Sequence, residues 1–217
     1  LLRPDLFTLL RFARERGFST SLMSNGTLVD GPAAREIRAA GTGDVQISLD
    51  GLEDTHDSLR GRGSYRRALA GLRHLADAGL ETSVNVTVSR LNMHQAGGLV
   101  EVAARAGAGS IAFSRLVPSG RGQGLSGQAL SAPEVAAFYE GLRRYRDNGA
   151  LVVTSRDPLA TVAEVRDLDA GSVPQTDLPF GGCAAGLFGV TIMADATVIP
   201  CRRMDLSIGS IRSGGFR

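Results

Sequence analysis

The chain has 217 residues, of which 43% are hydrophobic and 21% charged, a composition typical of a folded globular protein that excludes wholesale disorder. Its 24 basic and 22 acidic residues give a formal net charge of +2, which argues against nucleic acid or an anionic membrane as the main partner. No apolar stretch approaches the roughly 18 residues of a membrane span, and two cysteines form no disulfide framework, so we expect a cytoplasmic protein.

The chain repeats one pattern, in which an amphipathic helix is followed by a glycine and then by a strand. The expected strands cover residues 18–23, 45–49, 82–88, 110–117 and 151–154, and the helices before the first four end at Gly17, Gly41, Gly79 and Gly107. The last helix begins with a capping box at 131–134. Because strands alternate with helices throughout, the sequence predicts parallel β/α units.

Polar, glycine-rich segments follow the predicted strands, at residues 24–27, 50–51, 89–92 and 118–122. Parallel β/α folds carry their ligand-binding groups on the loops after the strands, so these segments are candidates for a cofactor site. Each one, taken alone, also fits an ordinary tight turn.

The carboxyl-terminal part has a different character. Residues 157–182 are expected to form a linker, since they contain a Gly- and Pro-rich stretch. Cys183 and Cys201 then flank an alternating run, a turn at Asp195-Ala196 and a second short strand, which together predict a β-hairpin. A hairpin brings its ends together, so the two thiols could share a metal centre; two buried free cysteines are the alternative.

Three segments, in this order, resemble radical S-adenosylmethionine (radical SAM) enzymes: Ser24-Asn25-Gly26-Thr27, Ile47-Ser48-Leu49-Asp50-Gly51 and His56-Asp57-Ser58-Leu59-Arg60-Gly61. The Cys183–Cys201 segment is similar to the start of the SPASM extension, which carries auxiliary iron–sulfur clusters. Ala196 stands where that family has glycine, and a small residue fits the turn. The resemblance implies an α/β fold, a partial (β/α)6 TIM-like barrel over residues 1–156, followed by the start of a SPASM-like domain over 183–217.

The chain departs from the family in lacking the Cys-x3-Cys-x2-Cys loop that holds the catalytic [4Fe–4S] cluster and the Gly-Gly-Glu-Pro motif. The segment Leu1–Leu6 looks like the helix that follows that motif. We therefore expect a fragment that is inactive by itself and whose first strand leaves an apolar sheet edge exposed.

The resemblance also implies roles for single residues. It places Ser24 and Asn25 along the SAM cleft, Ser48 and Asp50 near the ribose or methionine part, Arg60 on the methionine carboxylate, Leu116 against adenine, and Cys183 and Cys201 on an auxiliary [4Fe–4S] cluster. From the residues alone, an ion pair between Arg60 and Asp57 on one helix is an alternative for Arg60. For His56 we expect helix capping or a structural hydrogen bond.

The resemblance implies reductive cleavage of SAM to a 5′-deoxyadenosyl radical that modifies a peptide, protein or peptide-derived substrate, with flavodoxin or ferredoxin as electron donor. Tetrapyrrole (heme-type) side-chain chemistry is the alternative within the family, suggested by Arg115–Gly122. A metal-free barrel that binds a phosphorylated small molecule through the Gly120–Gly127 loop is the alternative outside it.

Overall fold

The computed structural model describes residues 1–145, 151–155, 157, 185 and 189–213. The chain divides into two compact units. The first comprises Leu1–Leu116 and Leu130–Arg156, and the second comprises Val117–Ala129 and Asp157–Arg217. The predicted linker at 157–182 lies outside the described residues except for Asp157. No helix in the described part is long and apolar enough to cross a membrane.

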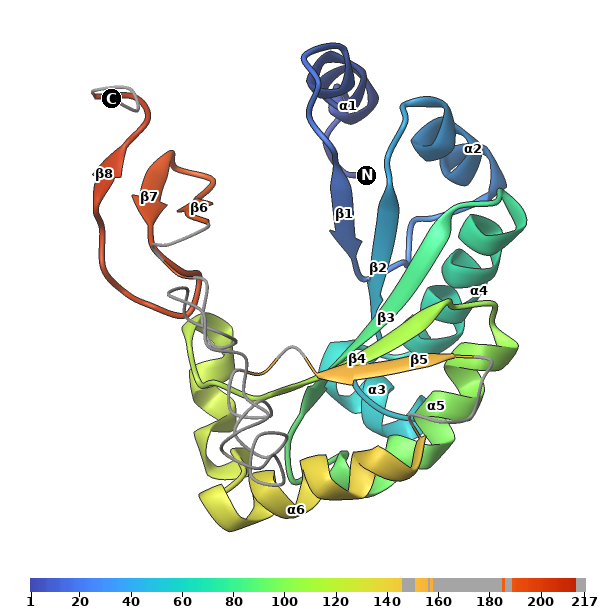
Figure 1. Ribbon diagram of the computed structural model, residues 1–217, viewed down its shortest axis with the longest axis vertical. Coiled ribbons are helices and arrows are strands. Elements are labelled where there is room, and N and C mark those ends of the chain that lie inside the picture. The colour runs from blue at the N-terminus through green and yellow to red at the C-terminus, as the bar shows by residue number, and fades with distance from the viewer. Residues whose placement is uncertain (146–150, 156, 158–184, 186–188, 214–217) are drawn as a thin grey trace, which may run out of the picture. The chain divides into compact units, whose positions relative to one another are not determined.

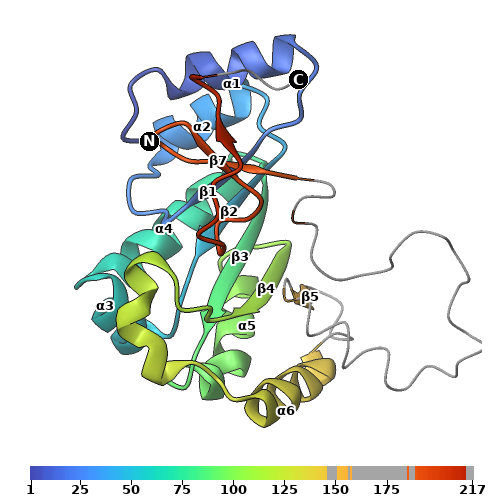
Figure 2. The same cartoon turned by 90° about the vertical axis from the view of Figure 1, so that its left-hand side faces the viewer.

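A five-stranded parallel sheet forms the centre of the first unit (Figure 1 and Figure 2). Its strands are β1 (Ser21–Ser24), β2 (Asp44–Ser48), β3 (Glu81–Val88), β4 (Ser110–Arg115) and β5 (Val152–Ser155). They follow one another across the sheet in chain order, and every neighbouring pair is parallel. Strand order equal to chain order is that of a barrel wall rather than of a doubly wound sheet. The predicted α/β fold is confirmed.

Helices connect these strands and cover one face of the sheet. They are α1 (Leu6–Glu15), α2 (Gly31–Ala39), α3 (Glu53–Arg60), α4 (Ser64–Asp77), the short 3₁₀ helix η1 (Met93–Gln95), α5 (Ala96–Arg105), α6 (Ala132–Leu142) and η3 (Arg143–Tyr145). Figure 1 shows α2, α4 and α5 along the same side of the sheet. The predicted helix–glycine–strand pattern is confirmed, because Gly17, Gly41, Gly79 and Gly107 all have φ between 73° and 85°, where glycine is favoured.

The two faces of the sheet differ in chemistry. Ile47, Val84 and Ile111 stand in register on adjacent strands and are fully buried. The residues between them point to the other face, since successive side chains of a strand alternate. These are polar or small: Gln46, Ser48, Ser83, Asn85, Thr87, Ala112 and Ser114. A buried parallel sheet is usually apolar on both faces, so the polar face suits a ligand-binding surface.

The second unit contains a small antiparallel sheet of β6 (Thr191–Ile192), β7 (Thr197–Ile199) and β8 (Gly209–Ser210). The predicted hairpin is confirmed, and in its turn the Asp195 carboxylate accepts the Thr197 N–H at 3.0 Å. Ala196 has φ 74°, which explains why glycine suits this position. Residues Gly120–Gln128 form the 3₁₀ segment η2, where a phosphate-binding loop was the alternative prediction.

Candidate functional site

The carboxyl ends of the parallel strands place several of the predicted residues at one edge of the sheet. Ser24 ends β1, Ser48 ends β2, and Asp50 is the second residue of the loop after β2. Leu116 directly follows β4 and is buried. This is the edge at which β/α folds assemble their sites.

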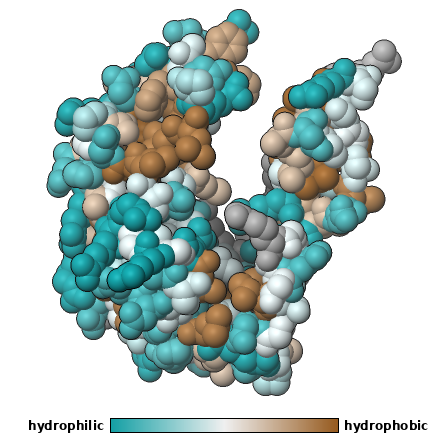
Figure 3. All heavy atoms as spheres, turned by 180° about the vertical axis from the view of Figure 1, so that it is seen from behind, coloured by the Kyte–Doolittle hydropathy of each residue, from teal (hydrophilic) through white to brown (hydrophobic). Residues whose placement is uncertain are grey.

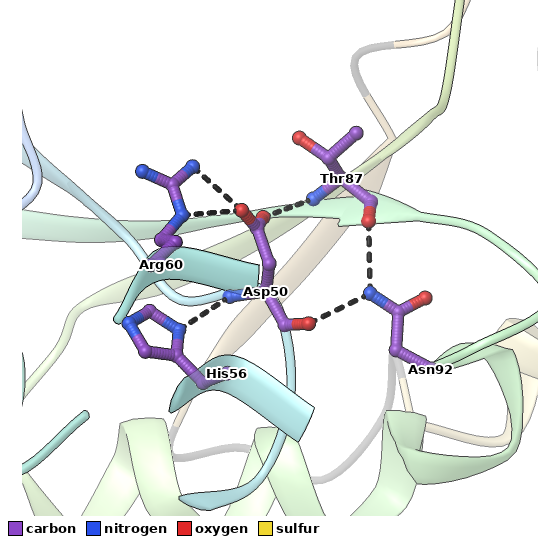
Figure 4. Close-up of polar contacts among 5 residues, drawn as sticks. All are labelled: Asp50, His56, Arg60, Thr87 and Asn92. Atoms are coloured by element: carbon purple, nitrogen blue, oxygen red, sulfur yellow. Dashed lines mark hydrogen bonds and ion pairs between the residues drawn. The ribbon is translucent and has the colours of Figure 1, made fainter. Parts of the chain in front are cut away.

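Asp50 and Arg60 form the central contact of the site (Figure 4). Asp50 Oδ2 accepts a hydrogen bond from Arg60 Nε at 2.6 Å and forms an ion pair with Nη2 at 2.5 Å. Asp50 Oδ1 accepts the N–H of Thr87, on β3, at 2.8 Å. The Asp50 side chain is 9% exposed and that of Arg60 33%, so the ion pair has a buried anionic end and an accessible cationic end.

The alternative ion pair between Arg60 and Asp57 is wrong. The Asp57 carboxylate instead accepts the N–H groups of Gly63 and Tyr65, at 2.5 and 2.8 Å, at the start of α4. These two hydrogen bonds hold the pKa of Asp57 below its usual value, because they stabilise the ionised form. Asp57 therefore fixes the junction between α3 and α4, and Arg60 is left to Asp50.

His56 holds the backbone of Asp50 with a hydrogen bond. Its ring is 1% exposed, and Nδ1 accepts the backbone N–H of Asp50 at 3.0 Å. Burial lowers the pKa of His56, because it disfavours the imidazolium. The ring is therefore neutral near pH 7 and carries its proton on Nε2. Of the two predicted roles, the structural hydrogen bond is confirmed.

Asn92 joins three parts of the site and was missed by the sequence analysis. It is 2% exposed. Its Nδ2 donates to the carbonyl oxygens of Asp50 at 2.9 Å and Thr87 at 2.8 Å, while its Oδ1 accepts the Ser89 N–H at 2.8 Å. The only signal in the sequence was that 89–92 is a polar loop after a strand, which does not single out one residue.

A second ion pair holds the loop that carries Asn92. Arg90 binds both oxygens of Glu134 with two hydrogen bonds, at 2.9 and 2.8 Å, and Glu134 also accepts the Ser131 N–H at the start of α6. These donors, Arg90 first, lower the pKa of Glu134 to about 2. The loop after β3 is thereby tied to α6.

The remaining predicted cofactor residues lie at the same edge without joining this network. Ser24 Oγ accepts the Gly26 N–H at 3.1 Å, and Asn25 Oδ1 accepts the N–H and hydroxyl of Thr27 at 3.2 and 3.0 Å. The tight-turn interpretation of this segment is therefore correct as far as its own hydrogen bonds go. Ser48 is half-buried on the polar face, in register with Asn85.

The described residues provide one of the two predicted cluster ligands. Cys201 follows β7 as a half-buried free thiol. Cys183 lies outside the described residues. Within the described part of the chain, no group of three or more His, Cys, Asp or Glu side chains could hold a metal.

Comparison with known proteins finds a family model that resembles the first part of the chain. Residues 1–103 match the sequence model of the radical SAM superfamily. Over these residues the chain is similar to radical SAM proteins. This family uses SAM and a [4Fe–4S] cluster, as predicted.

The relatives include heme synthases and mycofactocin maturases. An AdoMet-dependent heme synthase of Nitratidesulfovibrio vulgaris is 30% identical over all of this chain and 61% of its own length. The mycofactocin maturase MftC of Mycobacterium ulcerans is 36% identical over 55% of this chain and 33% of its own. The chain thus spans about three fifths of the heme synthase.

Solved structures with a similar fold include those of two further proteins. Streptococcus suis SuiB, bound to its precursor peptide SuiA, has a TM-score of 0.80 at 14% identity, covering 97% of this chain and 49% of SuiB. The enzyme anSMEcpe, with bound AdoMet and a peptide, has a TM-score of 0.67 at 18% identity, covering 96% of this chain and 60% of its own.

Proposed function

We propose that the complete protein is an enzyme that binds SAM at the carboxyl edge of this sheet and cleaves it reductively. The observation that carries the proposal is the Arg60 guanidinium, which Asp50 anchors at that edge and which stays one-third exposed. No described residue binds its Nη1, so a carboxylate has a donor to meet there. This is the partner that the methionine end of SAM provides.

The other residues would shape the rest of the cofactor pocket. The Ser48 hydroxyl, on the polar face, suits the ribose or ammonium group, and buried Leu116 offers an apolar surface for adenine. Ser24 and Asn25 would line the cleft after β1. Asp50 was predicted to lie near SAM as well, and its carboxylate binds Arg60 and the Thr87 N–H.

The proposed reaction would need two kinds of iron–sulfur cluster, and of their predicted protein ligands the described residues include Cys201. A reduced [4Fe–4S] cluster supplies one electron, with which SAM splits into methionine and a 5′-deoxyadenosyl radical that takes a hydrogen atom from the substrate. Cys201, with Cys183, would bind a separate auxiliary cluster, since thiolates are the soft ligands that such clusters need. A flavodoxin or ferredoxin would deliver the electron.

A matched pair of variants of the complete protein tests both parts, after anaerobic reconstitution. Arg60→Ala should weaken SAM binding at least tenfold, because it removes a charged hydrogen bond, while iron per chain is unchanged. Cys201→Ala should lower iron per chain and leave SAM affinity within about twofold. Titration of SAM and colorimetric iron analysis measure the two. Wild-type protein that binds neither iron nor SAM would overturn the proposal.

For the substrate, a tetrapyrrole is the first candidate and a peptide the second. Two heme synthases align with the whole chain, whereas a third heme synthase and the mycofactocin maturases align with 55–56% of it. The structure of SuiB, which has a similar fold, was solved with a bound peptide, and this supports a peptide as the second candidate substrate. Supplying reduced holoenzyme with iron porphyrins or with peptides, and measuring substrate-dependent 5′-deoxyadenosine, decides between them. Turnover with peptides alone would exclude the tetrapyrrole assignment.

A further inference from the structure

We infer that Asp50 is a positioning residue that acts on SAM through Arg60, and that Asn92 and His56 hold Asp50 itself in place. This inference rests on the proposed function, because it concerns the same carboxylate-binding end of the site. It goes further by dividing the work among the residues: Arg60 contacts the cofactor, and three buried side chains fix where Arg60 can be.

The geometry of the Asp50 carboxylate supports this division. Oδ2 of Asp50 contacts two nitrogens of Arg60, Nε and Nη2. Oδ1 accepts a hydrogen bond from the Thr87 N–H. Figure 4 shows the last nitrogen of the guanidinium turned away from Asp50. An incoming carboxylate therefore meets Arg60 on that side, while Asp50 stays behind it. A guanidinium already held in one rotamer loses less conformational entropy on binding than a mobile one.

The backbone of Asp50 is held by side chains rather than by the sheet. Its N–H donates to His56 Nδ1 and its carbonyl oxygen accepts from Asn92 Nδ2. Asn92 also binds the Thr87 carbonyl, so the loop after β2 is fixed to the end of β3. Both supporting side chains are almost fully buried, where an unpaired polar group would be costly. The position of the Asp50 carboxylate thus depends on groups 6 and 42 residues away.

A double-mutant cycle in the complete protein tests the inference, with SAM affinity as the readout. Asp50→Asn leaves one acceptor oxygen for both Arg60 and Thr87, so it should weaken SAM binding about tenfold, as should Arg60→Ala. If Asp50 acts through Arg60, adding Asp50→Asn to Arg60→Ala changes the affinity by no more than about twofold, because coupled residues are not additive. Additive losses would show that Asp50 contacts SAM itself and would overturn the inference.

Measuring the affinity for a second ligand distinguishes a loss of Arg60 positioning from a general disruption of the site. 5′-Methylthioadenosine has the nucleoside and sulfur of SAM but no carboxylate, so its affinity should stay within about twofold in every variant. Equal weakening of both ligands would mean general disruption of the site and would contradict the inference. Glu53→Gln is the matched control, because it removes a carboxylate of α3 that pairs with an arginine, Arg66, at 2.6 Å but lies outside the Asp50 network.

Asn92→Ala keeps the test open if Asp50→Asn fails to fold. It removes the hydrogen bond to the Asp50 carbonyl but leaves the ion pair. In the wild-type background, Asn92→Ala should therefore weaken SAM binding. In the Arg60→Ala background, adding Asn92→Ala should leave the SAM affinity unchanged. An equal loss in both backgrounds would overturn the inference. Absence of SAM binding in the wild-type protein would be a different outcome, since it would refute the proposed function.

Discussion

The buried His56 side chain, near the Asp50–Arg60 ion pair, makes the stability of the fold depend on pH. The groups around His56 are Asp50 and Asp57, which favour its protonated form, and Arg60, which opposes it. Burial is the largest influence and, with Arg60, outweighs the two carboxylates, so the pKa of His56 is lowered from its ordinary 6.5. The unfolded chain therefore binds a proton more readily than the folded one, so stability falls as the pH drops below about 6.5.

His56→Asn should remove this dependence. The amide oxygen of asparagine can accept the Asp50 N–H in place of Nδ1 but does not titrate. The difference in free energy of unfolding between wild type and His56→Asn should therefore shrink as the pH is lowered from 7 toward 5, as measured by urea unfolding at each pH. A difference that stays constant over this range would contradict the prediction.

At the scale of elements, the packing of α4 against the loop after β1 depends on a missing side chain. Gly71, in the middle of α4, lies so close to the loop that a Cβ there would collide with the carbonyl oxygen of Gly26. Helix interiors disfavour glycine, so its presence here reflects the close approach rather than helix propensity. The same loop begins with Asn25, directly after Ser24 at the end of β1, and both are predicted cofactor residues.

Gly71→Ala should lower the free energy of unfolding by about 1–3 kcal/mol, because the helix and the loop must move apart. Gly141 provides the matched control, since it lies in α6 and a Cβ there would meet nothing within 4 Å. Gly141→Ala should stabilise by about 0.5–1 kcal/mol through its higher helix propensity. Urea unfolding measures both, and the same sign for the two variants would refute the packing argument.

At the scale of the whole molecule, the sheet ends at β1 with apolar side chains in contact with solvent. β1 has a strand on one side only. Met23 is 63% exposed and nearby Phe18 68%, with Phe12 of α1 about half-exposed. Figure 3 shows a patch of apolar side chains in the upper part of the view. An apolar, unpaired strand edge favours association with another chain.

As these 217 residues, the protein should associate as its concentration rises, and Met23→Lys should reduce the association, because a charge on an edge strand opposes pairing. Sedimentation velocity at several concentrations measures this. Leu91→Lys is the control, since Leu91 is exposed in the loop after β3, away from β1. A monomer at every concentration, or the same effect of both substitutions, would contradict the prediction.

The elements were predictable because their signals are local. Helical periodicity, a closing glycine and a β-rich run lie within some 20 residues of one another, so the order of strands follows from reading along the chain. The hairpin between β6 and β7 was predictable for the same reason. The partner of Arg60 was not, because Asp57 and Asp50 both stand nearby in sequence and local spacing favours the wrong one.

The sequence by itself determined a parallel β/α sheet in chain order, a resemblance to radical SAM proteins, and the set of polar residues after the strands. Only the tertiary structure decided that Asp57 binds the start of α4, that Arg60 pairs with Asp50, and that Asn92 holds the Asp50 backbone. The physical reason is that periodicity and turn preference act between neighbours, whereas a hydrogen bond such as that from Asn92 to Asp50 joins groups 42 residues apart. Which groups become buried together is settled when the strands align.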